Sequence, residues 1–523
     1  MLKRCFIKFI FSLIVLNKTV KSRELQNGNG LFDKFHSINI SMAETAFEDL
    51  RHEKWFDSEQ ALRDDLSFLC DPRQKPYNWY SADVTMNGVE FNNIGIRKKG
   101  YIGSVIRAEL FPSLKLAIQK FGNKNMYFNG SSSVSCKNKI CDERKAHSHN
   151  ETKILTLNNL NQDKTSVTTC MILYIFEKMG VPAPRCSFAN VTVNGVHRGV
   201  YTNIEPIQKP FLRRVFGDDS GDLYEGTLSD LSEGNLLRME KKTNNKDTVE
   251  EAFNTMLETM KIKDDGEFLT KIKEILDLPE FLRLCMVEAM TNMDDGYSAN
   301  RNNFNAYFDV YSKKWHFIPW SPDRGLQFDF IGVLTQRPET ASNIWYTKTA
   351  LTRRLYNIAE VRAMYKSDME RLLINNWNTT EMLEVFHDML NLTYPGAKQR
   401  FPLLSKKYKK SVTSFELLYT ELVSKMNKFL TLKKELLLTE LRESKVRPIY
   451  PDVLLTHDDF CTILTVMSFI PWIVAIVSIA SCLLCSSLLM NRYKISKTTD
   501  KPPAAEVVPV VERLTTGQHP SLG

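Results

Sequence analysis

The feature that most constrains this chain is an apolar stretch near its C-terminus, residues 460–490, which contains no charged residue. A helix that crosses a bilayer needs about 20 such residues, so the stretch predicts a single membrane-spanning helix. Two aspartates precede it, and basic residues follow it at Arg492, Lys494 and Lys497. Because cytosolic flanks carry an excess of positive charge, residues 491–523 are expected to form a tail in the cytosol.

The N-terminus has the pattern of a secretory signal peptide over residues 1–22. A basic pair, Lys3 and Arg4, precedes a short apolar stretch that ends at Leu16. This stretch is short for a membrane anchor, which favours a cleaved signal peptide. The two ends together predict a single-pass type I membrane protein of the secretory pathway or the cell surface, with its bulk in the lumen or outside the cell.

The part between the two ends carries features of a luminal glycoprotein. Sequons of the form Asn-x-Ser/Thr predict glycosylation at Asn39, Asn129, Asn150, Asn190, Asn378 and Asn391. Six of the ten cysteines also lie in this part, and an oxidising lumen permits disulfides. Cys136 and Cys141 could close a small ring, and zinc binding is the alternative, although no second ligand pair follows at a suitable spacing.

Composition places the chain among ordinary globular proteins. Of its 523 residues, 43% are hydrophobic and 25% are charged, which excludes a wholly disordered or collagen-like protein. The net charge of +8 is spread too thinly over this length to indicate nucleic-acid binding, and no nucleic-acid-binding motif accompanies it.

Local patterns predict an α+β fold. Two Asn-Gly pairs, Asn87-Gly88 and Asn194-Gly195, are flanked by alternating apolar residues and predict β-hairpins, because a type I′ turn needs positive φ at both positions. Residues 166–179 predict a helix that stops at Gly180. Helical patterns then dominate at 248–260, 265–276, 278–292, 349–376, 380–391 and 412–444, with strands at 303–310 and 314–319. The order predicts a strand-rich first lobe and a helix-rich second lobe.

Three groups of polar residues could carry chemistry. Lys115 ends a predicted strand, and a lysine on a strand can bind nucleotide phosphate; a solvated surface lysine is the alternative. The segment from Asp294 to Asn303 is an acidic, amide-rich turn in which an aspartate could accept a hydroxyl proton and amide oxygens could help to hold Mg²⁺. A structural Asx turn would look the same. Asp323 follows a strand, where either a metal ligand or a plain turn would fit.

These groups belong to a longer series of short motifs. The series includes Gly95-Ile-Arg97-Lys-Lys-Gly100, Pro112-Ser-Leu-Lys115, Leu155-Thr-Leu-Asn158-Asn159, Met179-Gly-Val-Pro-Ala-Pro-Arg185, Gly221-Asp-Leu-Tyr224-Glu-Gly226 and Phe317-Ile-Pro-Trp320. In order and spacing the series resembles the spore-coat CotH family of atypical protein kinase-like domains. The resemblance covers residues 80–445, which leaves residues 23–79 as an N-terminal luminal extension and residues 446–459 as a juxtamembrane linker.

The resemblance implies a two-lobed atypical kinase-like fold, a bound ATP with Mg²⁺ or Mn²⁺, and transfer of the γ-phosphoryl group to Ser or Thr of a secreted or cell-surface protein. By position, Lys115 and Arg97 would hold the nucleotide phosphates. Asp295 would be the catalytic base. The metal ligands would be Asn303 and Asp323.

The chain also departs from the family pattern. Ser321 stands where the family commonly has an acidic residue, and Thr168 and Thr169 stand where it often has an Arg-Glu pair. Glu205 is then a candidate partner for the lysine in the nucleotide site. Since a kinase that loses such charges can lose most of its rate, a second reading stays open: a catalytically degenerate, invasin-like surface protein that acts in host-cell attachment or spore-coat assembly.

Overall fold

The computed structural model describes residues 31–53, 77–100, 109–122, 127–129, 151–163, 165–231, 239–243, 250–328, 344–408 and 414–443. The predicted signal peptide, the apolar stretch 460–490, the pair Cys136 and Cys141, and the sequon at Asn150 lie outside these residues. Among the helices within them, none combines the length and the apolar character that a membrane span requires.

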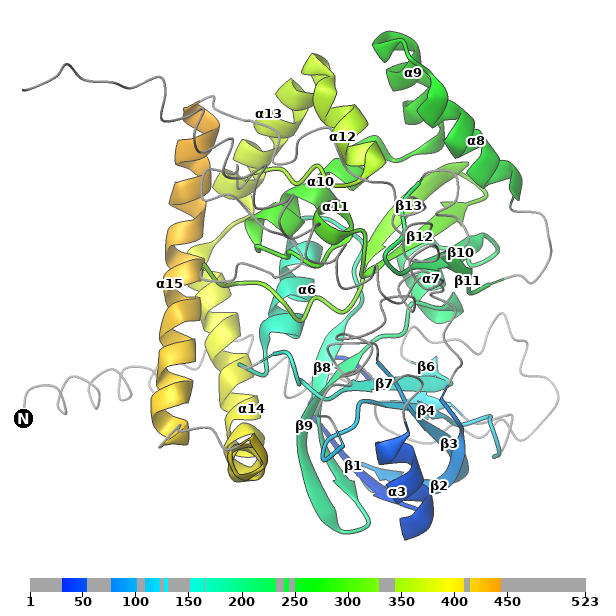
Figure 1. Cartoon of the computed structure of the whole chain (residues 1–523), viewed down its shortest axis with the longest axis vertical. Helices are drawn as coiled ribbons and strands as arrows, with labels where there is room; N and C mark the ends of the chain where they lie inside the picture. The colour runs from blue at the N-terminus through cyan, green and yellow to red at the C-terminus, as the bar shows by residue number, and fades with distance from the viewer. Residues whose placement is uncertain are drawn as a thin grey trace, which may run out of the picture. The chain divides into compact units, whose positions relative to one another are not determined.

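The first half of the described chain forms a closed barrel with the strand order β1-β2-β3-β4-β7-β9-β8 (Figure 1). Its strands are β1 (His36–Ser41), β2 (Tyr80–Met86), β3 (Val89–Lys98), β4 (Leu114–Ala117), β7 (Ile154–Asn158), β8 (Cys186–Val193) and β9 (Val196–Ile204). Both predicted hairpins are confirmed, since Asn87-Gly88 joins β2 to β3 and Asn194-Gly195 joins β8 to β9, with positive φ at all four residues. A short pair, β5 (Phe128–Asn129) and β6 (Glu151–Thr152), lies outside the barrel sheet.

The barrel extends further towards the N-terminus than the sequence predicts. Strand β1 and helix α3 (Glu44–His52) fall within residues 23–79, which were expected to form a separate extension. β1 pairs antiparallel with β2 and parallel with β8, so it closes the barrel between them. Its alternating side chains bury Ile38 and Ile40 in the barrel core, but its parallel partner lies about 150 residues further along the chain. No local pattern could reveal that pairing.

The second half combines a sheet of order β11-β10-β12-β13 with a set of helices. Its strands are β10 (Asp222–Gly226), β11 (Met239–Lys241), β12 (Phe304–Asp309) and β13 (Lys314–Pro319). Its helices are α6 (Thr168–Lys178), α7 (Lys209–Phe216), α8 (Glu250–Lys261), α9 (Asp265–Ile275), α10 (Leu278–Met290), α11 (Tyr297–Asn300), α12 (Ala350–Asn357), α13 (Ala359–Asn375), α14 (Thr379–Tyr408) and α15 (Phe415–Arg442). The α+β class is therefore confirmed, with the strand-rich part built as a closed barrel.

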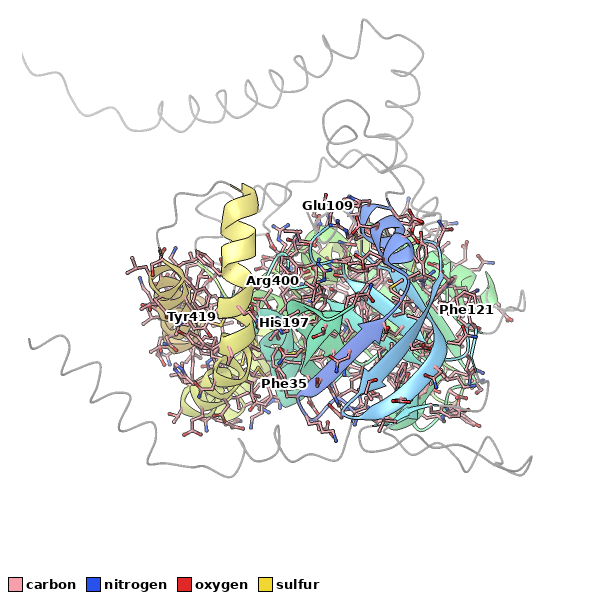
Figure 2. The ribbon with its side chains drawn as sticks, turned by 90° about the horizontal axis from the view of Figure 1, so that it is seen from below. Phe35, Glu109, Phe121, His197, Arg400 and Tyr419 are labelled. Atoms are coloured by element: carbon pink, nitrogen blue, oxygen red, sulfur yellow. A yellow bond between two sulfur atoms is a disulfide. The ribbon has the colours of Figure 1, made fainter. Side chains whose placement is uncertain are left out.

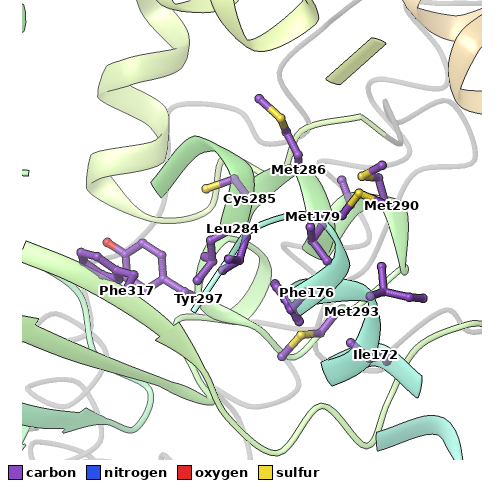
Figure 3. Close-up of a cluster of buried hydrophobic side chains, with 14 of the residues drawn as sticks. Ile172, Phe176, Met179, Leu284, Cys285, Met286, Met290, Met293, Tyr297 and Phe317 are labelled. Carbon is purple, nitrogen blue, oxygen red and sulfur yellow. The ribbon is translucent and has the colours of Figure 1, made fainter. Parts of the chain in front are cut away.

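Two separate hydrophobic cores fill these halves. One lies inside the barrel, and a larger one surrounds α6 and α10. Figure 3 shows side chains of α6, such as Phe176, packed near methionines of α10, such as Met290. α10 is buried almost all round, and α6 is buried on most of its surface, so the chain segments that leave their ends are held on a rigid base.

Two helical predictions differ from the structure for identifiable reasons. The pattern over 349–376 is interrupted at Ile358, whose extended backbone separates α12 from α13. The pattern predicted to end at residue 391 continues as α14 through Pro395 and Gly396. A side chain at Gly396 would approach Val200 of β9 within 2.1 Å, so the glycine permits the helix to lie directly on the barrel. Figure 2 labels Arg400 on this part of α14.

Cysteines and sequons in the described residues complete the comparison. Cys170 at the start of α6 forms a disulfide with Cys186 at the start of β8, a pairing that the sequence left open, and Cys285 is a buried free thiol. The sequons at Asn39, Asn378 and Asn391 are exposed. Asn190 is an exception: its Oδ1 is buried, and it lies 3.3 Å from the position of a side chain built at Gly396. α14 therefore covers this predicted glycosylation site.

Candidate functional site

The acidic turn is placed by a buried glutamate at the end of α10. Glu288 accepts hydrogen bonds from the backbone amides of Tyr297 and Ser298, both at 2.8 Å, and from the Ser298 hydroxyl. Burial raises the pKa of Glu288 to about 7. A side chain at Gly296 would lie 2.4 Å from the Glu288 carboxylate, so only glycine fits there. The Asp295-Gly296 pair is thus set by this close approach.

Three side-chain amides orient Asp295. Asn300 and Asn302 donate to its Oδ1 at 2.5 and 3.3 Å, and Asn303 donates to its Oδ2 at 2.9 Å. The neighbouring Asp294 is used differently, because Arg324 forms a 2.8 Å ion pair with its nearly buried carboxylate. The structure therefore distinguishes two adjacent acids that the sequence presents side by side.

The segment that carries Asp323 is fastened to this turn by backbone hydrogen bonds. The Trp320 amide donates to the Asn303 carbonyl at 2.9 Å, and the Leu326 amide donates to the Thr291 carbonyl at 2.7 Å. Ser321, the residue at the position where an acid was expected, lies with its Oγ 3.4 Å from Nδ2 of Asn158 on β7. Asp323 is consequently held between the acidic turn and the barrel.

The surroundings of Asp323 are rich in negative charge. Burial raises its pKa to about 7, and the nearby carboxylates of Asp295 and Asp163 raise it further, against the opposing effect of Lys99 and Arg324. We refer to Asp163, Asp295 and Asp323 as the acid cluster. Carboxylates that raise one another's pKa bind a cation favourably, because the cation relieves their repulsion.

Asp163 is a member of this cluster that sequence reasoning missed. It is 2% exposed, and it accepts hydrogen bonds from the Thr165 hydroxyl at 2.9 Å and the Thr169 amide at 3.2 Å. These bonds place it at the N-terminus of α6, and burial raises its pKa. The available signal was an aspartate followed by Thr and Ser just before a predicted helix, which is typical of a helix start.

Basic residues gather on the barrel side of the site. Lys115 on β4 lies opposite Arg97 on β3 in the strand register. Burial, together with the charges of Arg97 and Lys242, lowers the pKa of Lys115 to about 8. Burial lowers the pKa of Lys99 as well, and both Asp323 and Glu225 oppose that shift. We refer to Arg97, Lys99, Lys115 and Lys242 as the cation cluster.

Glu205 does not take the role that the sequence assigned to it. Its two carboxylate oxygens bind Arg185, at 3.1 Å, and Arg214, at 2.6 Å. The acid that opposes the lowered pKa of Lys115 is Glu225 of β10, which also forms a 2.5 Å ion pair with Lys242. Glu225 lies in the Asp-Leu-Tyr-Glu motif noted in the sequence, although that motif alone gave it no function.

Lys348 is a further basic residue that the sequence did not single out. Its Nζ lies 3.3 Å from Oδ1 of Asn300, and its backbone amide donates to the Ser298 carbonyl at 3.1 Å. Burial and the charge of Arg301 lower its pKa to about 8, while Asp295 and Asp294 oppose the shift. The acidic turn thus has a cation on the side of Asn300.

The donor set is suited to a magnesium or manganese ion held with a polyphosphate. Asn303 donates through its nitrogen to Asp295, so its amide oxygen is the atom that can serve as a metal ligand beside Asp323. Mg²⁺ commonly binds one or two carboxylates and takes its remaining ligands from phosphates and water. The cation cluster supplies the complementary charge for phosphates.

Within the described residues, another acid and histidine group meets simple distance criteria for a metal: Asp277, Glu280 and His316 lie within 4.8 Å of one another. Their contacts already explain their positions. Asp277 caps α10 by accepting the Glu280 amide at 3.1 Å, and Glu280 pairs with His316 at 2.9 Å.

Comparison with known proteins gives two findings. The family model described as CotH kinase protein matches residues 118–427. The inner spore coat protein H of Bacillus subtilis (strain 168) is 24% identical over 230 residues, which is 42% of this chain and 61% of that protein. The chain thus covers less than two thirds of that relative's length. Arg97, Lys99 and Lys115 precede the matched family region.

Proposed function

The chain belongs to the CotH family, and on that premise we propose that it is an ATP-dependent phosphotransferase that phosphorylates Ser or Thr hydroxyls of other proteins. The observation that carries the proposal is the meeting of the cation cluster with the acid cluster at Lys99, whose charge is felt by both Asp323 and Lys115. In the same proposal, the barrel is the smaller lobe of a kinase-like domain.

Nucleotide phosphates are the anions that best fit the cation cluster. Lys115 and Arg97 stand on neighbouring strands with fixed register, so their charges are preorganised for a polyphosphate. Four basic groups with only partial compensation repel one another, and a bound polyphosphate would relieve that repulsion. The divalent metal would be held by Asp323 and Asn303, where it would neutralise charge on the phosphates.

Asp295 is the catalytic base in this proposal. The substrate hydroxyl oxygen attacks the γ-phosphorus, its proton passes to Asp295, and the bond from the γ-phosphorus to the β,γ-bridging oxygen breaks to release ADP. The amides of Asn300, Asn302 and Asn303 hold the Asp295 carboxylate in one orientation before the substrate arrives. Lys348 would stabilise negative charge on the transferred group from the side of Asn300.

The substrate class follows from the compartment that we propose. The disulfide between Cys170 and Cys186 is typical of proteins that fold in an oxidising environment. It supports the signal peptide and the membrane-anchored orientation predicted from the sequence. We therefore propose secreted or cell-surface proteins as substrates.

The experiment is a pair of measurements on the full chain purified from a eukaryotic secretory host. The first is the thermal shift with ATP and Mn²⁺ or Mg²⁺, and the second is transfer of labelled γ-phosphate to the chain itself or to casein. We expect a nucleotide-dependent and metal-dependent rise in melting temperature, and labelling that is lost in Asp295→Ala. Absence of both the shift and the labelling would overturn the proposal and leave the non-catalytic surface protein as the better reading.

A further inference from the structure

Helix α15 places a lysine in the interior of the molecule, next to the acidic turn. Lys433 is 2% exposed, and its Nζ donates to Oδ1 of Asn292 at 2.7 Å. Burying an ammonium group costs free energy that an apolar side chain at the same position would not. Lys433 also lies beyond residue 427, where the family match ends, so the matched family region does not include it.

Asn292 is the point at which the two acidic segments of the site are joined. It has a left-handed backbone, with φ of 52°, and lies two residues before Asp294. Its Nδ2 donates to the Gln327 carbonyl at 2.9 Å, four residues after Asp323. The same side chain therefore accepts from α15 and donates to the segment that follows β13.

The neighbouring backbone leaves little freedom at this junction. The Leu326 amide donates to the Thr291 carbonyl, and a side chain at Gly325 would lie 2.9 Å from the same carbonyl oxygen. A shift of Asn292 would consequently move the acidic turn relative to the Asp323 segment. The distance between Asp295 and Asp323 depends on that relation.

We propose that Lys433 is a positioning residue for the metal site: by holding Asn292, it fixes the spacing between the acidic turn and the Asp323 segment. The proposal rests on the proposed function for the word metal, but the coupling between α15 and the two segments stands on the hydrogen bonds alone. It assigns to α15 a part in the site that lies 138 residues away in sequence from Asp295.

Two variants test the coupling without touching a catalytic group. Lys433→Met keeps the length of the side chain and removes its charge and its hydrogen bonds. Asn292→Gly removes the acceptor and keeps a residue that tolerates positive φ. Lys428→Met, at an exposed position on the same helix, is the matched control.

The first measurement is hydrogen exchange of the Leu326 amide and of residues 291–295 in the full chain. We expect exchange at Leu326 to become at least ten-fold faster in Lys433→Met and in Asn292→Gly, with no change in Lys428→Met. We expect the double variant to exchange no faster than the faster single variant, because both remove one connection. Unchanged exchange in both single variants, or a change confined to α15, would overturn the proposal.

The second measurement is the Mn²⁺ concentration that half-saturates the protein in the presence of a non-hydrolysable ATP analogue, followed by electron paramagnetic resonance of free Mn²⁺. We expect it to rise about ten-fold in Lys433→Met and to stay constant in Lys428→Met. If the wild type binds no Mn²⁺, the proposed function fails, while the exchange experiment still decides the coupling. Equal Mn²⁺ affinity in wild type and Lys433→Met would exclude a role of Lys433 at the metal site.

Discussion

The cation cluster and the acid cluster are built from different kinds of structure. On the barrel side, Lys115 and Arg97 stand opposite each other on adjacent strands, and backbone register alone sets their spacing. On the other side, the acids lie in turns that depend on side-chain hydrogen bonds. Non-glycine residues with left-handed backbones gather there, at Asn292, Arg301, Asn303 and Ser321. Such conformations persist only where the surroundings enforce them.

This difference has a consequence for mutations. A side chain on a barrel strand can be replaced without altering the backbone that carries it, so changes in the cation cluster should alter binding and leave folding intact. In the acidic turn each side chain also supports its neighbours. Changes there should therefore separate into those that affect chemistry and those that affect the shape of the turn.

The largest expected effect separates the two adjacent aspartates of the turn. Asp295→Asn should lower kcat about 10²–10⁴-fold, because it removes the proposed base, with a change in unfolding free energy of less than about 1 kcal/mol. Asp294→Asn should instead cost about 3 kcal/mol of stability, since it leaves Arg324 without its buried partner. Kinetics and urea unfolding of both variants make the comparison. If Asp294→Asn were the less stable and also the less active variant, the division of roles between the two acids would be wrong.

The next effect concerns the shape of the turn. Gly296→Ala should destabilise the chain by about 1–3 kcal/mol, because the new methyl group would overlap the Glu288 carboxylate. It should also reduce activity, since Glu288 holds the segment that follows Asp295. Gly266→Ala is the control: its nearest neighbour, Asp264, lies at 3.4 Å, and the position is exposed in α9. A neutral Gly296→Ala would show that the close approach is not required.

A smaller effect on stability is expected on the barrel side. Lys115→Met should raise the KM for ATP about ten-fold or more and leave the free energy of unfolding unchanged or slightly higher, because it removes one of several mutually repelling charges. Lys120→Met, at an exposed position just beyond β4, is the matched control. The KM for ATP and the urea midpoint should be measured on both. A large loss of stability in Lys115→Met would remove the contrast between the two sides.

The sequence predicted what is encoded locally. Both hairpins follow from Asn-Gly pairs, and Asp295 and Asp323 were marked by the turns that carry them. Residues whose role depends on distant partners were missed or misassigned. Asp163 meets Asp323 across 160 residues, and Glu205 turned out to pair with Arg214, only nine residues away. Motif order could not reveal that Glu225, and not Glu205, lies near the lysine.

The helices teach the same lesson in reverse. α14 was expected to end before Pro395-Gly396, because both residues disfavour a helix interior. It continues because the glycine lets the helix lie against Val200, a contact whose packing outweighs local preference. The burial of Asn190 under α14 follows from the same contact, which explains why a sequon pattern alone misjudged that site.

The smallest expected effect is a pH dependence that originates in the acid cluster. The pKa of Asp323 is raised from its ordinary value near 4 to about 7 in the folded chain, so the folded state holds this proton more tightly than the unfolded state does. Its contribution to stability is therefore fully present below about pH 4 and is lost as the pH rises to about 7. Asp323→Asn removes this contribution, which should make the variant more stable than the wild type at pH 8 by on the order of 1 kcal/mol.

Urea unfolding at pH 5, 6, 7 and 8 measures this effect as the difference between wild type and Asp323→Asn. Glu288 also has a raised pKa and adds a slope of the same sign, so the variant should retain part of the wild-type slope. Asp309→Asn, whose carboxylate has a lowered pKa, provides a contrast because its effect should appear only at lower pH. Parallel stability curves for wild type and Asp323→Asn would mean that Asp323 is ionised as readily when folded as when unfolded. The acid cluster would then lack the mutual repulsion that makes it a binding site for a cation, and the contrast with the preorganised barrel side would rest on the backbone alone.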